Sequence, residues 1–218
     1  MCRARHEFLS AGYYRPFAEA IASLIAEEPC NALCDCGCGE GYYLRVLRER
    51  LTQSELIGID LAKTSVKLAA KAERRARNPI RYAVAGIFDT PLPSFSFDAV
   101  LSIFAPIPVD EAYRLLKPNG RLLVAHPGQK HLDGLKEALY RVPYDNEPKL
   151  LSLDGFVLEK EEHCTYRVTL DRGSILPLFA MTPYYWKTSK EDADKLSVLE
   201  SLATTLDFRL SLYRKQSR

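Results

Sequence analysis

The chain has 218 residues, of which 47% are hydrophobic, so it is long and apolar enough to bury the core of a single α/β domain. Its 30 lysines and arginines almost balance 28 aspartates and glutamates. The net charge of +2 indicates neither a disordered chain nor, by itself, a nucleic-acid-binding one. No apolar stretch approaches the roughly 20 residues that span a bilayer, and the start lacks a signal-peptide core. We expect one domain over residues 1–218, a cytoplasmic location and no membrane partner.

An amphipathic helix is predicted ahead of the first strand. Apolar residues recur there at helical spacing, at Phe17, Ile21, Leu24 and Ile25. We therefore expect a short helical segment over about residues 1–30, which packs on the sheet formed by the later strands.

A glycine-rich turn follows the first predicted strand. Glycines alternate at Gly37, Gly39 and Gly41, and a helix begins after them. Because glycine tolerates positive φ and has no Cβ, the main chain can turn sharply there and press against a bound ligand. The dinucleotide fingerprint G-x-G-x-x-G is not met, since Tyr42 stands where its third glycine belongs. The turn predicts a nucleotide-like cofactor; the alternative is an ordinary tight loop between strand and helix.

Two acidic residues stand at the ends of neighbouring predicted strands. Asp35 precedes the glycine turn, where a carboxylate favours a cationic ligand and repels a pyrophosphate. Asp60 closes the next apolar run, where a carboxylate can accept hydrogen bonds from both ribose hydroxyls. Both residues are candidate cofactor ligands, although an acid at the second position is shared with NAD enzymes.

Strands alternate with helices along the rest of the chain, as in a mostly parallel sheet covered on both faces. The expected helices are 63–77, 109–116, 131–140 and 191–203. The expected strands are 80–85, 97–103, 121–126, 156–170 and 208–213, which make seven with the two that carry Asp35 and Asp60. Ligands of such sheets bind outside the carboxyl ends of the strands. That rule places around one cleft the glycine turn, both acids, Ala85, Gly86 and residues 104–106.

The clustered cysteines do not predict a metal site. Cys30, Cys34, Cys36 and Cys38 have no zinc spacing, and the last three straddle a strand and its turn, so we expect no convergence on a metal. In a reducing compartment they act as small apolar side chains that pack beneath the glycine turn.

Two sequence motifs resemble those of S-adenosylmethionine-dependent methyltransferases. The first is D-x-G-x-G-x-G at 35–41, and the second is the K-P-N-G-R turn at 117–121 before an apolar strand. The resemblance implies S-adenosyl-L-methionine as the cofactor. It also implies a Rossmann-like class I fold, that is, a mostly parallel seven-stranded sheet with helices on both faces.

A closer resemblance covers most of the chain. Five segments are similar, in order, to those of the large-subunit (23S) ribosomal RNA guanine-N1 methyltransferases: 5–16, 36–43, 103–106, 127–132 and 181–186. The resemblance implies transfer of a methyl group to N1 of a guanine in 23S ribosomal RNA, with ribosomal RNA as the partner. The alternatives are a methyltransferase for a small molecule and an inactive subunit that binds S-adenosylmethionine.

The family resemblance also assigns roles to single residues. It implies that Tyr14, Gly39, Glu40 and His131 bind S-adenosylmethionine. The ring of Tyr14 can lie beside the sulfonium as a cation–π partner, and His131 can donate a hydrogen bond to the methionine carboxylate. Without the resemblance, Tyr14 is better interpreted as an aromatic residue packed on the core and His131 as an exposed residue at a helix start.

Several features depart from that family or stay open. Its members carry a zinc-binding module ahead of the catalytic domain, and this sequence begins almost where that module ends. The segment 85–88 lacks the acid that many methyltransferases place against the adenine amine. No general base is identified, with His126 and Asp110 as the nearest candidates, and the oligomeric state is left open, with a dimer among the options.

Candidate RNA contacts are a basic cluster and a group of aromatic residues, together with a set expected near the mouth of the site: Lys130, Lys136 and Arg141, with Tyr140 and Tyr144 as stacking candidates. The cluster contains Lys71, Arg74, Arg75 and Arg77, although such clusters are more often solvated helix faces. Aromatic side chains are candidates to hold an extruded base; they are Phe104, Tyr184, Tyr185 and Trp186. Packing in the core is the alternative for each of them.

Overall fold

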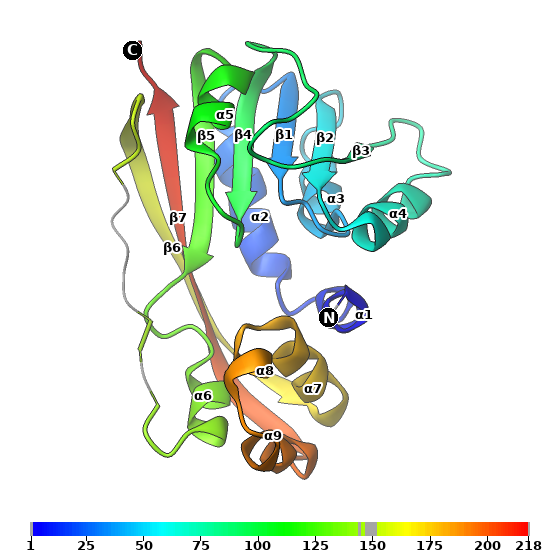
Figure 1. Ribbon diagram of the computed structural model, residues 1–218, viewed down its shortest axis with the longest axis vertical. Coiled ribbons are helices and arrows are strands. Elements are labelled where there is room, and N and C mark those ends of the chain that lie inside the picture. Colours follow the sequence, from blue (N-terminus) through cyan, green and yellow to red (C-terminus); the bar gives the residue numbers. More distant parts are fainter. Residues whose placement is uncertain (1, 144, 147–151, 218) are drawn as a thin grey trace. The chain divides into compact units, whose positions relative to one another are not determined.

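A computed structural model describes residues 2–143, 145–146 and 152–217 (Figure 1). The helices are α1 Cys2–Ser10, α2 Arg15–Ala26, α3 Tyr42–Arg48, α4 Lys63–Ala72, α5 Val109–Leu115, α6 Asp133–Leu139, α7 Arg172–Met181, α8 Tyr184–Lys187 and α9 Lys190–Ser197. The strands are β1 Ala32–Cys36, β2 Glu55–Asp60, β3 Arg81–Val84, β4 Phe97–Ile103, β5 Leu116–Pro127, β6 Phe156–Asp171 and β7 Ser201–Lys215. Within the described residues, no helix is both long enough and apolar enough to cross a bilayer.

The strands form one seven-stranded sheet in the order β3-β2-β1-β4-β5-β7-β6. The pairs β1 with β2, β1 with β4, β2 with β3 and β4 with β5 are parallel. Figure 1 shows β7 running against these strands. The side-chain bonds from Thr165 to Asp207 and from Ser211 to Glu161 fit an antiparallel pairing of β7 with β6. The structure confirms the predicted mostly parallel sheet.

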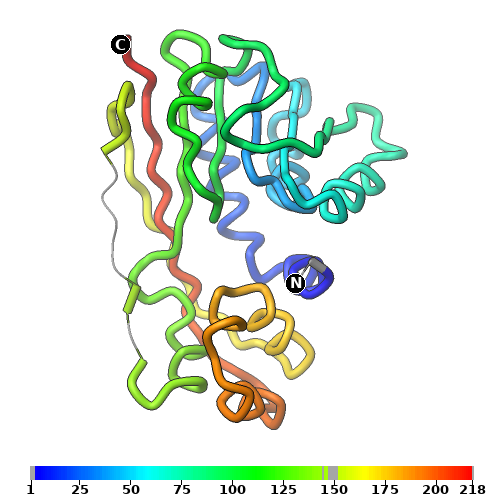
Figure 2. The backbone as a smooth tube through the Cα atoms, in the orientation of Figure 1, coloured from blue at the N-terminus to red at the C-terminus, as the bar shows by residue number. Residues whose placement is uncertain are grey.

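The chain divides into two compact units. Unit 1 contains Met1–Pro16, Pro127–Lys149 and His163–Phe208, and unit 2 contains Phe17–His126, Leu150–Glu162 and Arg209–Arg218. Figure 2 traces β6 and β7, each of which continues from one unit into the other. The units are thus connected through two shared strands. The single methyltransferase domain over residues 1–218 stays a prediction.

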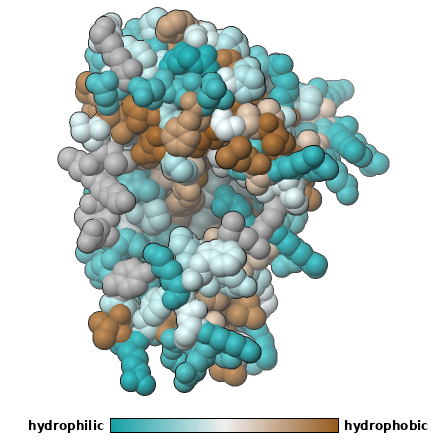
Figure 3. Space-filling model, in the orientation of Figure 1, coloured by the Kyte–Doolittle hydropathy of each residue, from teal (hydrophilic) through white to brown (hydrophobic). Residues whose placement is uncertain are grey.

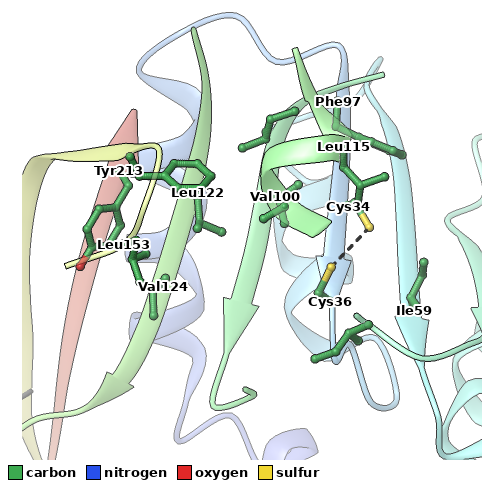
Figure 4. Close-up of a cluster of buried hydrophobic side chains, with 14 residues drawn as sticks. Cys34, Cys36, Ile59, Phe97, Val100, Leu115, Leu122, Val124, Leu153 and Tyr213 are labelled. Carbon is green, nitrogen blue, oxygen red and sulfur yellow. Dashed lines mark hydrogen bonds between the residues drawn. The ribbon is translucent and has the colours of Figure 1, made fainter. Parts of the chain in front are cut away.

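The core of unit 2 forms around the inner strands of the sheet (Figure 4). Cys34 and Cys36 lie on the same face of β1, fully buried, with their Sγ atoms 4.0 Å apart. These two thiols are therefore direct neighbours in the core. The contact with Cys36 and burial raise the pKa of the Cys34 thiol, so it packs as a neutral, apolar side chain.

The predicted helix before β1 is confirmed as α2, whose apolar residues Phe17, Ile21, Leu24 and Ile25 are at most 1% exposed. The amphipathic period buries one face of this helix against the rest of unit 2. β4 also matches its prediction residue for residue.

Two predicted helices end too late. The helix predicted over 63–77 stops at Ala72, and the one predicted over 191–203 stops at Ser197. Residues from Ser201 onward belong to β7, where Leu202, Thr204 and Leu206 are buried alternately. A period of two fits a strand, so pairing in the sheet overrides the helical preference of leucine and alanine.

Candidate functional site

The glycine turn folds as predicted between β1 and α3. Gly37, Gly39 and Gly41 have φ values of 91°, 56° and 76°. Gly41 stands immediately before α3 in the left-handed conformation, which disfavours a side chain. The N–H groups of Gly37 and Cys38 both donate to the carbonyl oxygen of Ile59 in β2, at 2.8 and 3.0 Å. The turn is thereby held against the end of the neighbouring strand.

Side chains from two other strands approach this turn closely. A Cβ added at Gly37 would lie 2.7 Å from the Cβ of Ala105, which follows β4. A Cβ at Gly41 would lie 2.2 Å from the hydroxyl oxygen of Tyr82 in β3. The absence of side chains therefore lets β1, β3 and β4 meet at one point. No sequence pattern singled out Tyr82, because its role depends on a contact between separate strands.

Asp60 binds the glycine turn directly. Its Oδ2 accepts a hydrogen bond from the N–H of Gly39 at 2.8 Å, and its Oδ1 accepts one from the N–H of Ala62 at 2.7 Å. A carboxylate has about four acceptor sites, so these two bonds leave acceptor capacity for ligand hydroxyl groups. The predicted cofactor ligand is thus also an anchor that fixes the turn to the end of β2.

Two other predicted ligands in unit 2, Asp35 and Glu40, are almost fully buried, with 1% and 2% of their surface exposed. The guanidinium of Arg45 donates to the carbonyl oxygen of Glu40 at 2.6 Å and lies 3.9 Å from its carboxylate. Burial, followed by the negative charges of Asp35 and Asp60, raises the pKa of the Cys38 thiol. The carboxylates of Asp35 and Asp60 therefore both lie close enough to the Cys38 thiol, beneath the turn, to act on it electrostatically.

The ends of β3 and β4 complete this edge of unit 2. The N–H of Ala85 donates to the carbonyl oxygen of Asp60 at 3.2 Å. Phe104, directly after β4, has a φ of 53°, and its ring centroid lies 5.5 Å from that of Phe17. A non-glycine residue at positive φ is uncommon and marks a locally strained backbone. The structure thus brings together the glycine turn, Asp60, Ala85 and the segment after β4.

Exposed apolar side chains at this edge were missed by the sequence analysis. Leu61 and Phe88 are 73% and 64% exposed, and they follow Asp60 and Ala85 closely in the chain. Large apolar side chains left in solvent beside polar ligand groups are typical of a binding site. The position of Leu61, directly after the acid that ends β2, was a sequence signal that could have identified it as a candidate binding residue.

Tyr14 and His131 form a separate buried pair in unit 1. The hydroxyl oxygen of Tyr14 lies 3.3 Å from Nε2 of His131, and the N–H of Asp207 donates to Nδ1 at 3.2 Å. Because Nδ1 accepts, the proton of a neutral imidazole resides on Nε2 and is donated to Tyr14. The ring of Phe208 packs on both side chains, with centroids 5.0 and 4.7 Å away.

The surroundings of this pair correct one alternative and fit another. His131 is 5% exposed, so its interpretation as an exposed residue at a helix start is wrong, and α6 begins two residues later at Asp133. Tyr14 is 3% exposed, which fits packing in the core of unit 1. Burial lowers the pKa of His131 to about 4, so the ring is neutral near pH 7.

This histidine predicts a specific pH dependence of stability. The unfolded chain binds a proton at His131 below about pH 6.5 and the folded chain only below about pH 4, so folding stability falls as the pH drops through this window. We expect a loss of roughly 3 kcal/mol between pH 7 and pH 4, measured by urea unfolding. His131→Gln should remove that part of the slope, whereas His163→Gln, at an exposed position of β6, should keep it. An unchanged slope in His131→Gln would contradict the buried neutral imidazole.

Other candidates lie elsewhere. The two candidate general bases differ in exposure: His126 is half-buried at the end of β5, and Asp110 is exposed in the first turn of α5.

Among the aromatic residues proposed to hold an extruded nucleobase, Tyr184 is buried. Tyr144 lies outside the described residues. Tyr185 and Trp186 are 47% and 74% exposed, with ring centroids 5.1 Å apart. Core packing is therefore excluded for Trp186. A cavity of about 490 Å³ in unit 1 contains none of the predicted cofactor ligands; it is lined by Lys130, Asp133, Lys136, Glu137, Pro143 and Asp145.

Comparison with known proteins agrees with this arrangement. Residues 34–124 match the model of a methyltransferase domain family. The chain is 32% identical to the 23S rRNA (guanine(748)-N(1))-methyltransferase of Streptomyces fradiae, over 90% of this chain and 71% of the relative. It is 31% identical to YxjB of Bacillus subtilis strain 168, a provisionally assigned 23S rRNA (guanine-N(1)-)-methyltransferase, over 90% of this chain and 72% of the relative.

More distant proteins share the fold. The crystal structure of a provisionally assigned methyltransferase from Bacillus halodurans C-125 superposes with a TM-score of 0.58 at 18% identity, covering 91% of this chain and 98% of that one. Methyltransferases of small molecules match less of the chain, 53% in the case of one O-methyltransferase from Saccharothrix syringae. With the strand order and the glycine turn, these findings place the chain in the family of 23S rRNA guanine-N1 methyltransferases, which are S-adenosylmethionine-dependent enzymes.

Proposed function

We propose that the protein transfers the methyl group of S-adenosylmethionine to N1 of a guanine in 23S ribosomal RNA. The observation that carries the proposal is the similarity to the Streptomyces fradiae enzyme, whose name states this reaction and whose match extends over 90% of the chain. A match of this length extends well beyond the glycine turn. The methyltransferase-domain model by itself matches only residues 34–124.

The edge of unit 2 fits the nucleoside part of this cofactor. The turn at Gly37 and Gly39 leaves main chain without Cβ atoms facing outward, and Asp60 holds its carboxylate beside it with acceptor capacity unused. In our proposal Asp60 accepts the ribose hydroxyls, and Leu61 and Phe88 cover the adenine, for which the segment 85–88 has no acid. Asp35 and Glu40 supply negative charge to the cationic end of the cofactor.

The buried pair of unit 1 is proposed to bind the methionine part. The neutral ring of His131 has one proton to donate, on Nε2, and it shares this proton with the hydroxyl of Tyr14. A carboxylate bound there accepts from this linked pair, and the tyrosine ring offers its face to a sulfonium. The proposed cofactor ligands are therefore Tyr14 and His131 in unit 1, and Asp35, Gly37, Gly39, Glu40 and Asp60 in unit 2.

The chemistry needs little from the protein beyond positioning. The cofactor supplies a methyl carbon that is already activated by its positive sulfur. With the cofactor bound, guanine N1 would attack this carbon, the carbon–sulfur bond would break with its electron pair remaining on sulfur, and the N1 proton would pass to a base. The chain's own contribution is to hold both reactants in line and to exclude water, which accounts for large rate effects without a strong acid.

The decisive experiment is product analysis. The purified protein is incubated with labelled S-adenosylmethionine and unmodified 23S ribosomal RNA, and the RNA is digested to nucleosides. We expect 1-methylguanosine as the labelled product. Labelled RNA without 1-methylguanosine would contradict the N1 position, and unlabelled RNA with intact cofactor binding would transfer the weight to a small-molecule acceptor.

A further inference from the structure

Cations without carboxylate partners are concentrated on one part of unit 2. We define the basic strip as the six cationic residues of α4 and of the turn after it: Lys63, Lys67, Lys71, Arg74, Arg75 and Arg77. Residues 63–77 contain these six cations and a single carboxylate, Glu73, so their net charge is +5. Since the whole chain carries +2, the remaining residues sum to −3. The near-neutral composition therefore conceals a strongly basic segment.

The strip points into solvent. Lysines recur at every fourth position of α4, about 6 Å apart along the helix axis, so they share one side of it. The opposite side buries Val66 and Ala69. All six cations are exposed, and Figure 3 shows hydrophilic side chains projecting from the surface over α4.

Several surface cations elsewhere are paired with carboxylates, unlike those of the strip. Lys160 pairs with Glu27 and Glu162, Arg172 with Glu200, and Lys195 with Asp192. Among the residues that the structure describes, none of the six strip cations lies within 4.0 Å of a carboxylate. Glu73 instead accepts a hydrogen bond from the N–H of Ile80. Like charges four residues apart destabilise a helix, so local stability does not account for this arrangement.

We propose that the basic strip binds backbone phosphates of the RNA that flanks the target guanine, an inference that rests on the proposed function. An anionic polymer matches a row of unpaired cations, because phosphate contacts release counterions and position the substrate without reading its sequence. The strip also begins three residues after Asp60, in the same unit as the glycine turn. RNA held there is positioned relative to the site that holds the nucleoside part of the cofactor.

The test uses fluorescence anisotropy to measure the protein's affinity for a fluorescein-labelled fragment of unmodified 23S ribosomal RNA. The salt concentration is varied between roughly 50 and 200 mM, a range over which phosphate contacts make the affinity strongly salt-dependent. The variant is Lys67→Ala, Lys71→Ala and Arg74→Ala together. We expect its affinity to fall about tenfold or more and the slope of log affinity against log salt to become shallower by about 2 to 3. Titration with S-adenosylmethionine should be unchanged, which also shows that the variant is folded.

A matched control removes the same charge elsewhere. Lys160→Ala, Arg172→Ala and Lys195→Ala together delete three cations that already have carboxylate partners, and we expect the parent's affinity and slope. If the strip variant keeps the parent's affinity and slope, or the parent itself binds no RNA, the inference is overturned. Strip-dependent binding without 1-methylguanosine would overturn the proposed reaction alone, and methylation with strip-independent binding would overturn the strip alone.

Discussion

Replacing Asp60 with alanine is expected to weaken the binding of S-adenosylmethionine at least about 100-fold, measured by isothermal titration. The carboxylate holds the N–H groups of Gly39 and Ala62 and is proposed to accept the ribose hydroxyls. Hydrogen bonds to a charged group contribute about 1.5–3 kcal/mol each, so the loss of the ribose contacts alone amounts to roughly 3 kcal/mol or more. Asp60→Asn keeps the shape and one acceptor, and should give an intermediate affinity.

Asp98 offers a closely matched control. Its Oδ2 accepts from the N–H groups of Asn31 and Ala32, both at 2.9 Å, and its Oδ1 accepts from Lys117. It therefore anchors main-chain amides as Asp60 does, but at the start of β4 rather than at the end of β2. Asp98→Ala is expected to lower the melting temperature and to leave cofactor affinity unchanged. Equal losses of affinity in both variants would show a general effect on folding and remove Asp60 from the site.

The sequence predicts the parallel half of the sheet well because its signals are local. Five of the seven residues in the run 97–103 are apolar, which fits a strand buried on both faces, and the run forms β4 without a shift at either end. The turn 37–41 is equally readable, since each alternate glycine occupies a positive φ. In such places the preference of the chain and the demands of packing agree.

Contacts between distant residues are where the sequence fails. The first residues of β7 have helix-forming side chains, and only pairing within the sheet makes them a strand. His131 is buried because the N–H of Asp207, 76 residues later, reaches its ring. Tyr82 acquires its position over the glycine turn only when β1 and β3 come together around β2. These relations have no local pattern, so a single sequence cannot show them.

Gly134→Ala is expected to cause a large loss of stability in unit 1. A Cβ at this position of α6 would lie 1.9 Å from the carbonyl oxygen of Ala203 and 3.1 Å from the Cα of Thr204. Both are main-chain atoms of β7, which cannot rotate away as a side chain can. Forced overpacking of this kind costs about 3 kcal/mol, which lowers the melting temperature of a chain of this size by roughly 6–12 °C.

The control is Gly173→Ala in α7. A Cβ there meets only Asp171 Oδ1, at 3.4 Å, so alanine should be neutral or stabilise the helix by up to about 1 kcal/mol. The two substitutions add the same methyl group to helical glycines of one unit and differ only in what it meets. Similar melting temperatures for both variants would contradict the close approach of α6 to β7.

The same substitution also tests how the site of unit 1 is held. Asp133, beside Gly134, accepts from the N–H and the hydroxyl of Thr205 at 2.7 and 2.9 Å, and Leu132 donates its N–H to the carbonyl of Thr205 at 2.7 Å. These bonds fix the start of α6, and His131 immediately precedes them. A methyl group that pushes α6 away from β7 therefore moves the imidazole away from the N–H of Asp207. If His131 binds the cofactor, the affinity for S-adenosylmethionine at a temperature where Gly134→Ala is still folded must fall as well, and an unchanged affinity would exclude His131 as a ligand.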